Sequence, residues 1–295
     1  MSKSHSLENK VALVTSSSPG TCADMAKLLA SAGAKVVICG RNANQGLATV
    51  RQIRQGGGRA TFVLADIAVI ADVRAMIDET IATYGRLDIL LNNVSNSYAQ
   101  DAPLPDVSES VWDRIIEPLL KGTFFCCQLS IPFLQQCDGG TIINLIEKTP
   151  GLQGRSVSNI CQGGTVAMTS AIAQQFNSSA VTANLICVTP LASDISRDLL
   201  LSKIVIANPN VDKPFASVGD AVMYLAQEGH TLRGAALLVH TVEENAPKVH
   251  TGKAYSAESA PPSNPSSPDS SVLDSSVSDS SVPDSSISDD SSTNS

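Results

Sequence analysis

The chain has 295 residues, of which 43% are hydrophobic but only 4% aromatic, and it carries a formal net charge of -8. This length and apolar content suit one sizeable core of aliphatic side chains, as in a parallel sheet covered by helices. Seven acidic residues and no basic ones follow Lys253, so the first 253 residues hold 21 acids and 20 bases. A nearly neutral body excludes electrostatic capture of nucleic acid.

The seven cysteines are scattered without a C-x-x-C pair. This spacing predicts buried, reduced thiols rather than disulfides or a zinc site. The first ten residues contain no apolar segment typical of a signal peptide, and no apolar run approaches the ~18 residues of a membrane span. We therefore expect a soluble, cytoplasmic protein that binds no membrane and no metal.

The first part of the chain alternates short apolar runs with segments of helical spacing. The predicted elements are strand 10–16, helix 22–34, strand 35–40, helix 44–58, strand 60–66, helix 72–85 and strand 87–93. Gly33 and Gly85 stand where a glycine in the left-handed conformation commonly ends a helix.

The alternation continues with longer helices. The predicted elements are helices around 108–117 and 119–136, strand 140–146, helix 159–176, strand 181–188, helix 217–229 and strand 235–240. Strands of five to seven apolar residues separated by helices predict a doubly wound, parallel α/β sheet of the Rossmann-like kind. We expect it to form a single domain over residues 1–250.

Residues 251–295 differ in composition, because Ser, Asp and Pro dominate and Asp recurs every five residues from Asp269 to Asp289. Few apolar groups and one sign of charge predict a disordered tail. The tail is either simply solvating or phosphorylated. The second interpretation rests on four serines that each precede an Asp by three residues, namely Ser271, Ser276, Ser281 and Ser286.

The turn after the first strand reads TSSSPGTCADMA, Thr15 to Ala26. Together with the order of elements, it resembles the short-chain dehydrogenase/reductase family over residues 8–245. The family's turn is T-G-x-x-x-G-x-G; here Ser16 stands at the first glycine, Gly20 keeps the second and Cys22 replaces the third. The resemblance implies that Ser16, Gly20 and Thr21 border the phosphates of a dinucleotide at a helix N-terminus.

Three further segments bear on the cofactor. Arg41 in VVICGR stands where NADP-preferring members carry a basic residue, and a guanidinium can bind a 2′-phosphate with two hydrogen bonds. Asp66 in LAD matches the acid at the adenine edge, and Asn92 and Asn93 in NNVS match the family's NNAG. The resemblance thus implies an NADP(H) cofactor, while the alternative for Arg41 is an ordinary solvated surface position.

The segments that should carry the chemistry depart from the family. Its members use Asn, Ser, Tyr and Lys, but WDRIIEPLLKGTFFCCQ puts Leu119 at the Asn position and INLIEKTPGLQG puts Ile146 and Glu147 at the serines. CQGGTVAMTSAIAQQF puts Ser158 at the Tyr position and Gln162 at the Lys position. An aliphatic hydroxyl is far less acidic than a phenol, so we expect ordinary carbonyl reduction by this route to be closed.

Glu147 is the remaining candidate for acid–base chemistry, since desolvation would raise its pKa; otherwise it is a solvent-facing residue at a strand end. Three functions stay open. The first is a non-redox enzyme (isomerase, cyclase or dehydratase) acting on a small hydrophobic molecule in biosynthesis. The second is a non-catalytic partner of an active relative. The third is an atypical NADPH-dependent reductase using Glu147 or water as proton donor. The resemblance also implies a homo- or hetero-oligomer formed through the long helices 119–136 and 157–176.

Overall fold

The computed structural model describes residues 7–15, 20–94, 101–147, 156–190, 215, 217–228 and 232–241. Ser16 and the whole of the predicted tail lie outside these ranges.

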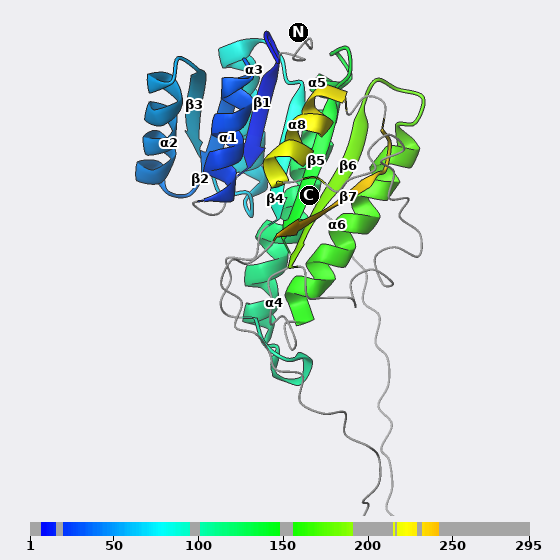
Figure 1. Ribbon diagram of the computed structural model, residues 1–295. Coiled ribbons are helices and arrows are strands. Elements are labelled where there is room, and N and C mark those ends of the chain that lie inside the picture. Colours follow the sequence, from blue (N-terminus) through cyan, green and yellow to red (C-terminus); the bar gives the residue numbers. More distant parts are fainter. Residues whose placement is uncertain are drawn as a thin grey trace, which may run out of the picture. The chain divides into compact units, whose positions relative to one another are not determined.

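Seven parallel strands form one sheet in the order β3-β2-β1-β4-β5-β6-β7 (Figure 1). Their bounds are β1 (Val11–Thr15), β2 (Lys35–Gly40), β3 (Arg59–Leu64), β4 (Ile89–Val94), β5 (Thr141–Glu147), β6 (Thr182–Pro190) and β7 (Ala236–Thr241). The strand order reverses between β1 and β4, so the predicted doubly wound parallel sheet is confirmed.

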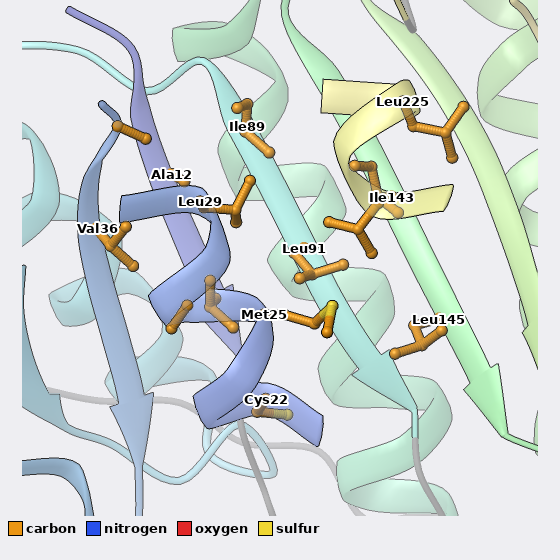
Figure 2. Close-up of a cluster of buried hydrophobic side chains, with 14 of the residues drawn as sticks. Ala12, Cys22, Met25, Leu29, Val36, Ile89, Leu91, Ile143, Leu145 and Leu225 are labelled. Carbon is orange, nitrogen blue, oxygen red and sulfur yellow. The ribbon is translucent and has the colours of Figure 1, made fainter. Parts of the chain in front are cut away.

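Helices cover both faces of the sheet. They are α1 (Thr21–Ser31), α2 (Ala43–Gln55), α3 (Ile70–Tyr84), α4 (Glu109–Ile116), α5 (Thr123–Leu134), α6 (Ser156–Gln175) and α8 (Val218–Glu228). Aliphatic side chains of α1, α2 and α8 pack on one face, part of which is drawn in Figure 2, and those of α3, α5 and α6 pack on the other. The core is therefore two aliphatic layers with the sheet between them, as the scarcity of aromatic residues predicts.

The two predicted glycine helix ends are present. Gly85 ends α3 in the left-handed conformation with φ of 77°, and its N–H donates to the carbonyl of Ile81. Gly33, with φ of 103°, follows the last residues of α1.

The helices predicted around 108–117 and 119–136 are joined instead of separate. A π-helical segment, η2 (Glu117–Gly122), links α4 to α5 and contains Pro118. A proline lacks the N–H that continues an α-helix, and a widened turn absorbs that defect without ending the helix. The two predicted stretches are therefore both helical, and η2 joins them into one continuous helical segment. At Gly122 the backbone passes so close to the carbonyl of Ile67 that any Cβ would collide with it.

A buried carboxylate fastens the amino ends of the strands. Asp88 accepts two hydrogen bonds from Arg86, at 2.8 and 2.6 Å, and one from the N–H of Val11 at 2.9 Å, and Lys10 lies 3.3 Å away. Burial opposes the charge on Asp88, but the Arg86 hydrogen bonds, the Val11 N–H and Lys10 together lower its pKa. The charged form of Asp88 thus ties β1 to the start of β4.

All seven cysteines are buried and none forms a disulfide bond, as predicted. In the part of the chain that the structure describes, no helix has the length and apolar content to cross a membrane. Within the same residues, no three His, Cys, Asp or Glu side chains gather closely enough to hold a metal ion.

Candidate functional site

The carboxyl ends of β1 and β4 meet where the strand order reverses, the place at which open parallel sheets bind ligands. Gly20 lies between β1 and α1 with φ of 108°, a conformation that side chains disfavour. A Cβ built on Gly20 meets no described atom within 4 Å, which leaves room for a phosphate oxygen. Thr21, the first residue of α1, presents its backbone at the same helix end.

Cys22, at the family's third glycine, points into the core. Its side chain is 1% exposed, and the thiol sulfur lies 2.6 Å from Nδ2 of Asn93 and 3.8 Å from the carbonyl oxygen of Thr15. Figure 2 shows Cys22 at the end of the buried row that continues through Met25 and Leu29 of α1. The thiol of Cys22 therefore lies buried between α1 and β4.

Arg41 and Asp66 meet at the same edge of the sheet, at the ends of the neighbouring strands β2 and β3. Nη1 of Arg41 lies 3.8 Å from Oδ2 of Asp66, and the two side chains are 54% and 33% exposed. Oδ1 of Asp66 accepts the N–H of Ala68 at 3.0 Å, which fixes the carboxylate. The structure thus brings these two predicted cofactor residues together and leaves the guanidinium accessible.

The side chain of Asn92, which the resemblance predicted beside the cofactor, makes its hydrogen bonds within the fold. Its Nδ2 donates to Oδ1 of Asn144 at 3.0 Å and to the sulfur of Cys127 at 3.3 Å, and its Oδ1 accepts the hydroxyl of Thr15 at 3.2 Å. Asn144 in turn donates to the hydroxyl of Thr169 on α6 at 2.9 Å. Thr15, Asn92, Asn144 and Thr169 are all buried, and their hydrogen bonds join β1, β4, β5 and α6.

Two residues that the sequence resemblance put at the family's Asn position and at one of its Ser positions, Leu119 and Ile146, lie in the core. Leu119 and Ile146 are 3% and 1% exposed and belong to one apolar cluster with Val157 and Cys161 of α6. Burial raises the pKa of the Cys161 thiol to about 12, so it stays neutral. The cluster consists of apolar side chains and one neutral thiol. A polar site would instead need side chains that donate hydrogen bonds.

Ser158, which the sequence resemblance predicted at the family's Tyr position, is buried beside Asp101. One carboxylate oxygen of Asp101 accepts the N–H of Ser158 at 2.8 Å, and the other accepts the N–H of Ala102 at 2.8 Å and of Val157 at 3.3 Å. Burial opposes the charge on Asp101, but hydrogen bonds from the Ser158 hydroxyl and these three N–H groups lower its pKa. The backbone of Ser158 is therefore held by Asp101, and Ser158 is only 1% exposed.

The structure gives less detail for the two remaining predicted site residues, Glu147 and Gln162. Glu147 is the last residue of β5, opposite Val188 of β6, and its side chain lies outside the structural description. Gln162 lies one turn after Ser158 on α6 and is half-buried.

Sequence reasoning missed Asp101, Asn144 and Thr169. Asn144 gives a usable signal, since it is a polar residue between apolar neighbours in β5, whereas Thr169 gives none, because polar residues recur throughout α6. Asp101 gives none, because it lies 57 residues before Ser158 in the chain and outside every motif.

A seven-stranded, doubly wound sheet with a glycine at its switch-point turn defines the class of α/β proteins that bind dinucleotides. The short chain dehydrogenase family model matches residues 10–203, and the chain belongs to that family.

Characterised relatives carry dehydrogenase names. The chain is 35% identical over 185 residues to (2S)-[(R)-hydroxy(phenyl)methyl]succinyl-CoA dehydrogenase subunit BbsD of Thauera aromatica, covering 62% of this chain and 73% of the relative. It is 30% identical over 243 residues to L-fucose dehydrogenase of Oryctolagus cuniculus, covering 78% and 83% respectively. A dehydrogenase/reductase from Sinorhizobium meliloti 1021 superposes with a TM-score of 0.66 at 26% identity, covering 80% of this chain and 96% of that structure.

Proposed function

We propose that this chain holds NADP(H) at the carboxyl edge of its sheet and acts on a small hydrophobic molecule in biosynthesis without the family's Tyr/Lys proton relay. The reaction is a non-redox one, such as isomerisation, cyclisation or dehydration. The observation that carries the proposal is the burial of Ser158, whose N–H donates to the carboxylate of Asp101.

The residues at the cofactor edge fit such a dinucleotide. Space beside Gly20 at the start of α1 suits a pyrophosphate, and the accessible guanidinium of Arg41 suits a 2′-phosphate. In a non-redox reaction the bound dinucleotide would act as a structural or electrostatic element of the substrate pocket and would transfer no hydride. Asp66 accepts the Ala68 N–H and lies beside Arg41, so it orients the guanidinium.

The residues at the predicted catalytic positions support the loss of the Tyr/Lys proton relay. Tyr serves the family because a phenol can give or take a proton near neutral pH when a cation is beside it. Leu119, Ile146 and Ser158 offer no comparable acid, and Gln162 carries no charge. Packing of Leu119 and Ile146 into the core removes them from contact with any substrate.

The test is a calorimetric titration with NADPH, followed by incubation with a carbonyl panel and metabolites from a deletion strain. The proposal expects NADPH binding and product formation, detected by mass spectrometry, without loss of NADPH absorbance. Steady NADPH oxidation with a simple ketone would contradict it and would favour a reductase assisted by Glu147 or water.

A second function, partnership with an active relative or a second copy, is favoured by the composition of α5 and α6. Neither helix contains an Asp, Glu, Lys or Arg, and Phe124 and Ile160 are 46% and 43% exposed on them. A surface helix normally carries charge on its outer face, so these helices fit burial against another chain. Light scattering that finds only a monomer, together with absence of a co-purifying family member, would rule this partnership out.

We place this function in the cytoplasm. Seven buried cysteines without a disulfide bond suit a reducing compartment. Microscopy of the tagged full chain tests this placement.

A further inference from the structure

We infer that residues 101–107, called the strap below, form a lid that one carboxylate holds shut over Ser158. The inference rests on the proposed function only in taking Ser158 as the tyrosine position; the lid itself is a property of the fold.

The strap is fastened at its two ends. At the first end Asp101 accepts the N–H groups of Val157 and Ser158, and the carbonyl of Ala102 accepts the N–H of Ser156 at 3.3 Å. At the second end Val107 packs against the apolar cluster that contains Leu119 and Ile146.

The middle of the strap has few contacts of its own. Residues 103–106 are all exposed, and the Leu104 side chain is 72% exposed. Pro103 and Pro105 fix the backbone, so the strap moves as a stiff piece and not as a loose loop. A segment with few buried apolar contacts opens at lower free energy than the core around it.

The hydrogen bonds of Asp101 both cap helix α6 and hold the strap. A helix is normally capped by the residue just before it, whereas the cap of α6 comes from Asp101, 57 residues before Ser158. The negative carboxylate also suits the positive end of the α6 dipole. Because the cap and the strap share these hydrogen bonds, losing the carboxylate uncaps α6 and frees the strap in one step, which exposes Ser158.

Thiol labelling measures this opening directly, because all seven native cysteines are buried. Ser158→Cys introduces a nearly isosteric thiol, and its rate of reaction with a maleimide reports the open population. Asn159→Cys, at the exposed neighbouring position on α6, gives the rate of an uncovered thiol. We expect Ser158→Cys to label far more slowly than Asn159→Cys.

The second comparison removes the carboxylate. Losing a cap changes an opening equilibrium by about 5- to 30-fold, so Asp101→Ala/Ser158→Cys should label faster than Ser158→Cys by about that factor. Asp106→Ala/Ser158→Cys is the matched control, since Asp106 is an exposed acid in the same strap, and its rate should equal that of Ser158→Cys.

Mass spectrometry counts the labels and separates lid opening from unfolding. One added label in the Asp101→Ala pair supports the lid. If several labels appear, Asp101→Asn, which keeps one acceptor oxygen, replaces it and should give an intermediate rate with one label. Equal rates for Ser158→Cys and Asn159→Cys, or no acceleration when Asp101 is changed, overturn the inference. No cofactor or substrate is needed, so this result is independent of the test of the proposed function.

Discussion

The side-chain amide of Asn92 on β4 donates to the side-chain oxygen of Asn144 on β5 at 3.0 Å, in the buried interior between the sheet and its helices. Thr15 and Thr169 extend this contact to β1 and α6. The chain of hydrogen bonds fixes how the strands at the ligand edge sit relative to α6.

Replacement of Asn92 by Leu should destabilise the fold. The substitution leaves the Asn144 side-chain oxygen and the Thr15 hydroxyl without this partner in a buried place, which costs about 1–3 kcal/mol per group. Urea unfolding measures the loss. Asn159→Leu on the exposed side of α6 is the control and should change stability by less than about 0.5 kcal/mol. Equal effects of both substitutions would show that the buried amide contributes nothing of its own.

Replacement of Asp88 by Asn should destabilise the fold and flatten its dependence on pH. Hydrogen bonds to a charged group are worth about 1.5–3 kcal/mol, and the partial exposure of Arg86 and Lys10 argues for the lower part of that range.

The sign of the pH effect follows from the pKa of Asp88, which folding lowers from its ordinary value of 3.8. The stabilisation is complete above that value and is lost as the pH falls through the folded pKa. Urea midpoints measured from neutral to acid pH should fall steeply in the native protein and less steeply in Asp88→Asn. Parallel curves would contradict the assignment.

Two glycine substitutions should have opposite signs. Gly122→Ala forces a Cβ against the carbonyl of Ile67 and should cost about 1–3 kcal/mol. Gly163→Ala places a Cβ where no described atom lies within 4 Å, inside α6, and should stabilise by about 0.5–1 kcal/mol. Thermal melting distinguishes them. A destabilised Gly163→Ala that also loses an oligomer would indicate that α6 packs against a second chain.

Replacement of Arg41 by Ala tests the proposed 2′-phosphate contact. Losing a charged hydrogen bond should weaken NADPH binding by about tenfold or more and leave NADH binding nearly unchanged. Arg51→Ala, at an exposed position on α2, is the matched control. An equal loss of affinity for NADPH and NADH would mean that Arg41 supports the structure of this edge but does not contact the 2′-phosphate.

The periodicity of apolar residues predicted the sheet, its helices and the left-handed glycines, because those features are local. It predicted helices around 108–117 and 119–136 but not that η2 joins them, since the effect of a proline depends on whether packing accepts a widened turn. Motif spacing placed Arg41 and Asp66 at one edge, where they meet. It could not show that Asn92 turns inward or that Asp101 caps α6, because both depend on partners distant in sequence.

The charge cluster of Asp88, Arg86 and Lys10 has a consequence for how this protein can change. It lies at the amino ends of β1 and β4, whereas Gly20 and Arg41 follow the carboxyl ends of their strands. The charge cluster that stabilises the fold and the proposed ligand-binding edge are thus at opposite ends of the strands. Residues at the carboxyl ends can therefore be substituted during evolution while the charge cluster at the amino ends continues to stabilise the fold.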